Sequence, residues 1–294
     1  MEIEVVCEGL QFPEGPIAMA DGSVILVEVQ GQRLTRVLAD GRKEVLAETG
    51  GGPNGAAIGP DGAVWIANNG GAFFYPESYS GGFIQRFDLA SGELSTVHEA
   101  CDGQRLIAPN DLVFDRQGGL WFTDHGRPTP DGRIYGAVYH ARPDGSGLSR
   151  QRARLVSPNG VGLSPDERTL YVADTELGRL WAFDIVEPGV LAPPAGHFSQ
   201  GRVVCALQGG LSLDSLAVEA GGKVCAATIG QHVSGITAFD PDGTTEFLGF
   251  PDPICTNICF GGDDMRQAWI TGSGSGRLYR CRWPRPGLRL NFGA

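Results

Sequence analysis

Five acidic or amide side chains stand at equivalent places in the sequence, each just ahead of a short apolar run. They are Glu14, Asn54, Asn110, Asn159 and Asp214. Carboxylate and amide oxygens are hard ligands that suit Ca²⁺ or Mg²⁺. Because no Cys or His occupies these places, a thiolate or imidazole metal site is disfavoured. The pattern predicts one divalent cation held by Glu14, Asn110, Asn159 and Asp214. Asn54 shares the position, and we expect it to contact substrate or to form a turn.

Each of these side chains alone has a simpler explanation. Asn or Asp ahead of a strand often forms a turn by bonding to its own backbone. Four such residues at one equivalent position in four separate units instead favour a shared site. Glu14 and Asp214 would balance the charge of the ion, while the Asn oxygens would add ligands without adding repulsion.

The elements that must position these residues repeat along the chain at roughly 40 to 55 residues, the spacing of propeller blades. In most units a polar motif is followed by an apolar run, a Gly- or Asp-bearing turn and a second apolar run, as in 56–67 and 112–123. No helical periodicity of useful length is present. The units begin near Phe12, Pro53, Pro109, Pro158, Leu213 and Thr256.

Six such units predict an all-β fold, a six-bladed β-propeller with four-stranded blades around a central channel. We expect residues 1–294 to form a single domain. The last unit lacks one strand at its C-terminal end, and Ile3 to Cys7 are expected to supply it and close the ring.

In a propeller the innermost strand of every blade lines the channel, so the five polar residues are expected at one mouth of it. Loops that follow the second strands would ring the same mouth. In these loops Phe73, Phe74 and Tyr75 are candidates for an apolar wall. His125 with Arg127, and Gln231 with His232, are candidates to contact a substrate carboxylate or sugar hydroxyls.

The composition of the chain limits the kinds of partner and the location that we expect for the protein. The formal net charge is −11 and the chain has no Lys/Arg cluster, so nucleic acid is not an expected partner. No apolar run approaches the length of a membrane span. The seven cysteines are odd in number and scattered, which favours free thiols in a reduced compartment over disulfides. The first residues carry neither the basic nor the apolar region of a secretory signal, and we expect a cytoplasmic protein. The sequence gives no indication of oligomeric state.

The ordered set of motifs resembles the SMP-30/gluconolactonase/luciferin-regenerating enzyme (LRE)-like family over essentially the whole chain. The matching stretches are Pro13-Glu14-Gly15-Pro16, Pro109-Asn110-Asp111-Leu112, Ser157-Pro158-Asn159-Gly160, Leu170-Tyr171-Val172-Ala173-Asp174, Asp214-Ser215-Leu216-Ala217-Val218 and Thr256-Asn257-Ile258-Cys259-Phe260-Gly261-Gly262. The resemblance implies a six-bladed propeller with one divalent cation in the channel. It also implies hydrolysis of sugar lactones or related small esters.

The resemblance places metal ligands at Glu14, Asn159 and Asp214, with Asn110 as a further ligand or a substrate contact. Two departures concern the substrate. Asp214 is followed by Ser215 where the family usually has Gly, and Ala108 stands where the vertebrate lactonases have Arg. The sugar contact of that subgroup is therefore not carried over, and the particular lactone stays open.

The expected chemistry is metal-assisted hydrolysis. The cation, Ca²⁺ by preference with Mg²⁺, Mn²⁺ or Zn²⁺ as alternatives, would polarise a lactone carbonyl, and Asp214 would activate the attacking water. Glu14 is the alternative base. No Gly-x-Ser-x-Gly motif and no Ser-His-Asp or Cys-His spacing indicates a covalent mechanism. A phosphotriesterase-like hydrolase and a non-catalytic cation- or ligand-binding propeller are the alternative functions.

Overall fold

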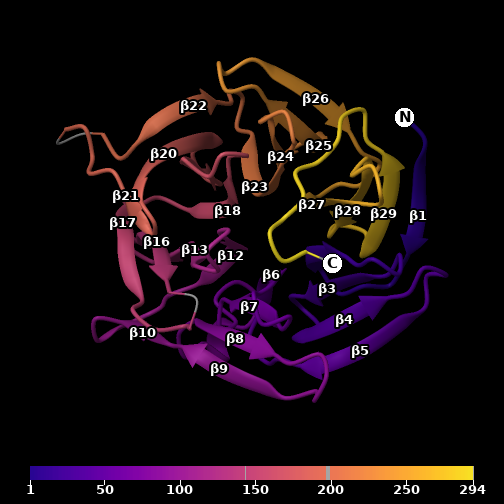
Figure 1. Ribbon diagram of the computed structural model, residues 1–294, viewed down its shortest axis with the longest axis horizontal. Coiled ribbons are helices and arrows are strands. Elements are labelled where there is room, and N and C mark those ends of the chain that lie inside the picture. Colours follow the sequence, from indigo (N-terminus) through magenta and orange to yellow (C-terminus); the bar gives the residue numbers. More distant parts are fainter. Residues whose placement is uncertain (143, 197–198, 294) are drawn as a thin grey trace.

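The computed structural model describes residues 1–142, 144–196 and 199–293. Six antiparallel sheets are arranged as blades around a central channel, which confirms the predicted propeller (Figure 1). The innermost strand of each blade begins within one residue of the unit expected from the repeat. No helix in the described part of the chain is long and apolar enough to cross a membrane.

Within each of the first three blades, strands follow one another from the channel to the rim in chain order. They are β2 (Pro13–Ala18), β3 (Val24–Glu28), β4 (Arg33–Val37) and β5 (Lys43–Glu48); β6 (Pro53–Ile58), β7 (Val64–Asn68), β8 (Phe83–Phe87) and β9 (Leu94–His98); and β12 (Pro109–Phe114), β13 (Leu120–Asp124), β16 (Gly136–Ala141) and β17 (Ser149–Leu155). The connections carry a 3₁₀ turn, Pro76–Ser78, and two hairpins, β10–β11 (Ala100–Cys101, Gln104–Arg105) and β14–β15 (Arg127–Thr129, Gly132–Ile134).

The last three blades have the same order with two additions: β21 also pairs with β20, and the N-terminal strand β1 joins the sixth blade. They are β18 (Pro158–Leu163), β19 (Thr169–Asp174), β20 (Arg179–Glu187), β21 (Val190–Leu191) and β22 (Arg202–Ala206); β23 (Ser212–Val218), β24 (Val224–Gly230), β25 (Val233–Phe239) and β26 (Thr245–Gly249); and β27 (Cys255–Gly261), β28 (Gln267–Gly272), β29 (Arg277–Arg282) and β1 (Ile3–Cys7).

Strand β1 closes the ring, as expected from the sequence. It pairs antiparallel with β29, with Ile3 opposite Cys281 and Glu4 opposite Arg280. The Arg280 guanidinium also contacts the Glu4 carboxylate at 2.7 Å. The first and last strands of the propeller therefore share one sheet, with β1 as its outer strand.

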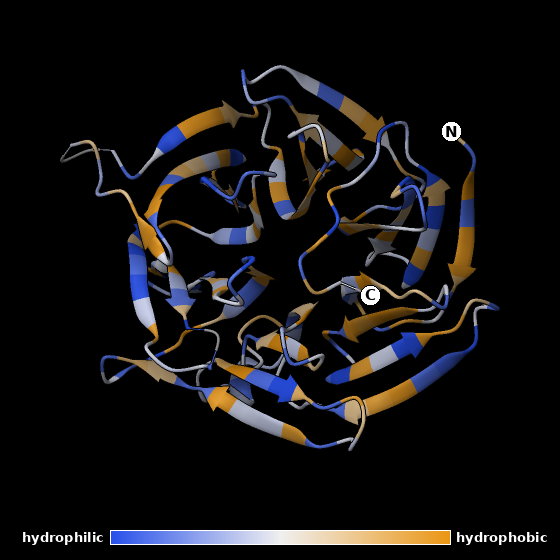
Figure 2. Ribbon diagram, viewed as in Figure 1, coloured by the Kyte–Doolittle hydropathy of each residue, from blue (hydrophilic) through white to orange (hydrophobic). Residues whose placement is uncertain are grey.

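The core consists of six apolar clusters, each formed mainly where one blade packs against the next. Between the second and third blades, for example, the rings of Trp65 and Phe114 meet edge to face at 5.6 Å. The outermost strands carry both hydrophilic and hydrophobic residues along their length (Figure 2). All seven cysteines are free, as expected.

All six inner strands carry a register irregularity at the polar motif, for example between Glu14 and Ile17 and between Pro109 and Leu112. A β-bulge bends the strand and changes the direction of the side chains beside it. Because the irregularity recurs in every blade, the polar motifs occupy one layer of the channel in equivalent local geometry.

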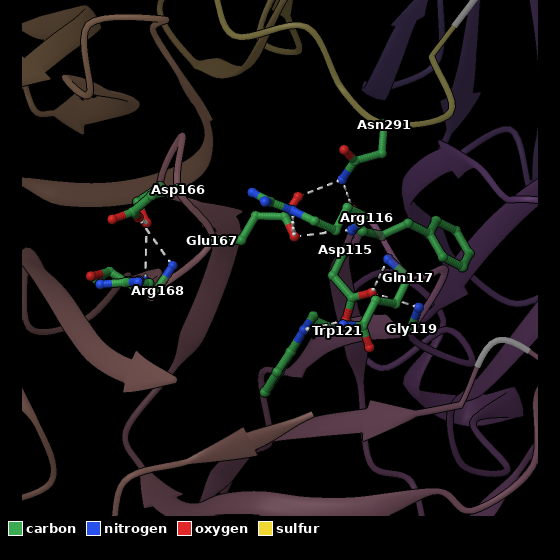
Figure 3. A network of polar contacts seen from close by, with 12 residues as sticks. Asp115, Arg116, Gln117, Gly119, Trp121, Asp166, Glu167, Arg168 and Asn291 are labelled. Carbon is green, nitrogen blue, oxygen red and sulfur yellow. Dashed lines mark hydrogen bonds and ion pairs between the residues drawn. The ribbon is translucent and has the colours of Figure 1, made fainter. Parts of the chain in front are cut away.

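The half of the channel beyond this layer encloses a cavity of about 610 Å³. Its walls are the later parts of the inner strands, and the C-terminal segment 288–293 lies across it. Asn291 holds that segment by donating to the Phe114 carbonyl at 3.1 Å and to Glu167 Oε1 at 2.7 Å, while Arg116 Nε donates to Glu167 Oε2 at 2.9 Å (Figure 3). The C-terminal segment thus covers the mouth opposite the polar layer.

Candidate metal-binding and active site

The predicted site residues lie together because inner strands start where second strands end. Pro13 pairs with Glu28, Pro109 with Asp124 and Pro158 with Asp174. The residue after each of these prolines therefore lies at the same mouth of the channel as the loops that follow the second strands. The set at this mouth, which we call the polar layer, comprises Glu14, Asn54, Asn110, Asn159 and Asp214.

Glu14 is almost completely buried, with 1% of its surface exposed. Its Oε2 accepts hydrogen bonds from Gly15 N–H at 2.9 Å and from Asn257 Nδ2 at 2.8 Å. Burial, together with the nearby negative charge of Asp214, raises the pKa of Glu14 well above its usual value, although both hydrogen bonds oppose that shift. A cation would stabilise a site in which the Glu14 and Asp214 carboxylates repel one another.

Asp214 is only partly buried. Burial raises its pKa to about 7, against the opposing effect of hydrogen bonds from Asn159 and the Ser215 N–H. Asn159 Nδ2 also donates to Thr175 Oγ1 at 3.1 Å, and Asn159 Oδ1 accepts from Ser215 Oγ at 3.3 Å. For its oxygen to face a cation held with Asp214, the Asn159 amide would have to turn.

Asn110 provides a direct test of whether the site fits a cation. Its Oδ1 is buried and has no hydrogen-bond partner in the described part of the chain. An unpaired buried acceptor is costly, and a cation or a donor on a ligand would satisfy it. Among the described residues no group of three His, Cys, Asp or Glu side chains is placed to hold a metal. The donor set therefore fits a divalent cation only if amide oxygens join the two carboxylates.

Two polar residues that the sequence reasoning did not assign tie neighbouring blades at this layer. Asp111 Oδ2 accepts a hydrogen bond from the Val161 N–H in the next blade at 2.9 Å, and burial raises the pKa of Asp111 to about 7. Asn257, in the sixth blade, donates to Glu14 in the first. Asp111 is the residue after Asn110, and Asn257 lies at the equivalent place in the sixth blade. We call this place the second position of the motif.

The second motif position is glycine where the blades approach by backbone alone. A Cβ on Gly55 would lie 2.6 Å from the Asn110 carbonyl oxygen, and one on Gly160 would lie 2.6 Å from the Leu216 nitrogen. These contacts are too close for any side chain. This position reads Gly15, Gly55, Asp111, Gly160, Ser215 and Asn257 along the chain, and the Asp and Asn among them were the signal in the sequence that could have revealed the two inter-blade contacts.

A second set of buried acids fixes the segments that lead into the inner strands. Asp124, the last residue of β13, accepts hydrogen bonds from the backbone N–H groups of Ile107 at 2.7 Å and Ala108 at 2.8 Å. At the end of β3, Glu28 accepts from the Gln11 N–H at 2.7 Å. Each acid thus holds the chain just ahead of a residue of the polar layer. Burial raises the pKa of Asp124, and its three backbone hydrogen bonds oppose that effect.

The residues proposed for substrate contact are differently placed. Asn54 is buried within the polar layer. His125 is buried directly after β13, where its ring meets Phe73 at 5.1 Å, and burial lowers its pKa to about 4. The Arg127 guanidinium lies over the Tyr79 ring at 4.6 Å. Gln231 and His232 are exposed in the turn between β24 and β25.

Fold and polar layer together define a class: a six-bladed propeller with two carboxylates and several amides at one mouth of its channel. Residues 12–274 match the family described as SMP-30/Gluconolactonase/LRE-like region, and the chain belongs to that family. It is 28% identical to a gluconolactonase of Zymomonas mobilis, over 88% of this chain and 76% of that protein.

Solved structures agree with the fold. A gluconolactonase from Xanthomonas campestris superposes with a TM-score of 0.77 at 26% identity, over 96% of this chain and 89% of that one. Regucalcin from Agrobacterium tumefaciens, described as a calcium-binding protein, superposes with a TM-score of 0.75 at 22% identity, over 97% of both chains.

Proposed function

We propose that the protein is a metal-dependent hydrolase that opens a sugar lactone or a related small lactone, a carboxylic-ester hydrolase of the gluconolactonase kind. The observation that carries the proposal is the pairing of the Glu14 and Asp214 carboxylates beside the unpaired Asn110 Oδ1 at the channel mouth. Membership of the family and the similarity to a gluconolactonase support lactones as the substrate class.

Glu14, Asn110, Asn159 and Asp214 would hold the cation, and the all-oxygen donor set favours Ca²⁺, with Mg²⁺, Mn²⁺ and Zn²⁺ as alternatives. When bound, the cation would polarise the lactone carbonyl and stabilise the negative charge that develops on its oxygen. Asn257 keeps Glu14 oriented through its hydrogen bond. Asn54 at the same layer is assigned to the substrate.

Asp214 is the proposed general base. Its carboxylate takes a proton from the water whose oxygen attacks the carbonyl carbon. The ring C–O bond then breaks, and the leaving ring oxygen takes up that proton, so the product is the open hydroxy acid. Glu14 is less suited to this role, because it is almost fully buried and its Oε2 is occupied by Gly15 and Asn257.

The test is proton release from a panel of lactones and phosphotriesters, measured with Ca²⁺, Mg²⁺, Mn²⁺ or Zn²⁺ and again after chelation. We expect lactone hydrolysis that chelation abolishes and that added cation restores. Turnover of phosphotriesters alone would overturn the lactone assignment. If no substrate of either kind is hydrolysed with any of the four cations, the enzymatic function is wrong and a non-catalytic cation-binding propeller remains.

A further inference from the structure

Two pairs of rings lie at the mouth of the channel that carries the polar layer, and we call them together the aromatic wall: Phe12 with Phe74, and Phe73 with His125. Phe12 and Phe74 meet edge to face with their ring centroids 4.9 Å apart, and Phe73 and His125 do so at 5.1 Å. Phe73 and Phe74 are adjacent in the connection between β7 and β8, so they link the two pairs. The wall therefore runs from the first blade, past the second, to the third.

The aromatic wall stands at the mouth where the polar layer lies. Phe12 precedes Pro13 and Glu14, and His125 follows Asp124, whose partner across the sheet is Pro109. Phe73 is 37% exposed, so part of its ring is accessible from solvent. An apolar surface is thus presented to any molecule that reaches Glu14 and Asn110.

The connection that carries Phe73 and Phe74 is anchored at both sides. Tyr75 donates its hydroxyl to the Gln30 carbonyl of the first blade at 2.5 Å. Tyr79 donates to the Ile107 carbonyl, ahead of the third blade, at 2.8 Å. Both anchors follow Phe73 and Phe74 in the same connection and hold it between the two blades, and a surface ordered in advance loses less entropy when a ligand binds.

Backbone geometry supports the same conclusion at Phe12. This residue has a φ of +58°, in the left-handed region that bulky side chains avoid, and it precedes a proline. A hydrogen bond from the Val29 N–H to the Phe12 carbonyl, 3.0 Å long, holds the conformation. Strain retained at a residue beside a functional layer points to a use for the side chain that it positions.

The chemistry of the wall is poorly suited to a polyhydroxylated ligand. Three of its members are hydrocarbon rings, and the fourth, His125, has its ring against Phe73. The Arg127 guanidinium lies over the Tyr79 ring. The Arg133 guanidinium, which donates to the His125 carbonyl at 3.2 Å, is paired with Glu176. A sugar lactone would leave several hydroxyl groups facing carbon, whereas an alkyl or aryl substituent would bury apolar surface there.

We infer that the aromatic wall selects lactones that carry an alkyl or aryl substituent over polyhydroxylated sugar lactones. The inference rests on the proposed lactone hydrolysis and specifies its substrate. Asp214 would act at the ester group, which a cation held by the polar layer would polarise, while Phe12, Phe73 and Phe74 would receive the substituent.

The test compares lactones of one ring size: D-glucono-δ-lactone, unsubstituted δ-valerolactone and δ-decalactone, which carries a pentyl chain. We expect kcat/KM for δ-decalactone to exceed that for the gluconolactone by about tenfold or more. In Phe73→Ala and Phe74→Ala the ratio of the two kcat/KM values should fall at least about tenfold, mainly through KM for δ-decalactone. Phe73→Leu should restore most of the ratio. Phe247→Ala, which removes an exposed ring from the rim strand β26, is the matched control.

The outcomes separate the two claims. A preference for gluconolactone that Phe73→Ala leaves unchanged would overturn the aromatic-wall inference while lactone hydrolysis stands. If no lactone is hydrolysed, calorimetric titration with the hydroxydecanoate product decides: binding that weakens in Phe73→Ala but not in Phe247→Ala supports the wall without the enzyme. Absence of binding overturns both.

Discussion

Asn257 Nδ2 lies 2.8 Å from Glu14 Oε2, so the last blade of the propeller holds the first carboxylate of the polar layer. The hydrogen bond joins residues 243 positions apart in the chain. It stabilises the charged form of a carboxylate that burial and Asp214 otherwise disfavour.

Asn257→Ala should therefore weaken cation binding. Loss of a hydrogen bond to a charged group costs about 1.5–3 kcal/mol, which corresponds to roughly a 10- to 100-fold loss of affinity. Calorimetric titration with Ca²⁺ measures it. Asn291→Ala, at the opposite mouth, is the control and should bind Ca²⁺ as the wild type does. Equal affinities for Asn257→Ala and wild type would show that this contact does not shape the site.

Asp214→Asn should lose turnover while the protein remains folded. The substitution keeps the size of the side chain but removes the group that takes the proton, an effect of about 10²–10⁴-fold on kcat. Proton release from the best lactone of the panel measures the rate, and circular dichroism monitors the fold. Near-normal kcat in this variant would transfer the role of base to another group, with Glu14→Gln as the next variant to assay.

Added Ca²⁺ should raise the melting temperature, because it binds the folded protein and relieves the repulsion between Glu14 and Asp214. At a free concentration of about 100 times Kd the gain is about 2.7 kcal/mol, which is several degrees for a chain of this size. Scanning calorimetry with and without a chelator measures the shift. Glu14→Gln should show a smaller shift than wild type, and an identical shift in this variant would place the cation elsewhere.

The buried pair of Glu28 and Arg33 should make stability depend on pH. Although burial alone would raise the pKa of Glu28, hydrogen bonds from Arg33, Thr35 and the Gln11 N–H hold it below its usual value. A lowered pKa in the folded state stabilises the protein above the unfolded pKa, and this contribution is lost as pH falls through the folded pKa.

Glu28→Gln should accordingly cost about 1.5–3 kcal/mol at pH 7, since it removes charge-assisted hydrogen bonds. The difference from wild type should shrink as pH is lowered from about 5 toward 3. Urea unfolding across this range measures it. Asp40→Asn, in a solvent-exposed pair with Arg42, should change neither stability nor its pH dependence. A cost of Glu28→Gln that is constant with pH would contradict the assignment.

The sequence predicted the blade count, the closing strand and the position of the polar-layer residues at the start of the inner strands, because these follow from local patterns that recur at a regular interval. The roles of these residues toward a cation and a substrate stay predictions. It did not reveal the inter-blade contacts of Asp111 and Asn257 or the anchoring role of Asp124. Those roles depend on which backbone N–H the fold brings to a carboxylate, and Val161 is 50 positions from Asp111. The sequence also did not predict the left-handed backbone of Phe12, because phenylalanine is a residue type that avoids this conformation.

Because one sheet contains both the first and the last strand of the propeller, the order of synthesis differs from the order in which the strands can pair. Glu4 and Arg280, in contact there, are 276 positions apart. On the ribosome the first five blades have all their strands once residue 249 has emerged, whereas β1 has no partner until β29 follows. The strand that precedes all the others in the propeller is thus the last to be incorporated. Because long-range pairing of this kind slows folding far more than it lowers stability, β1 is an unpaired strand exposed to aggregation during that interval.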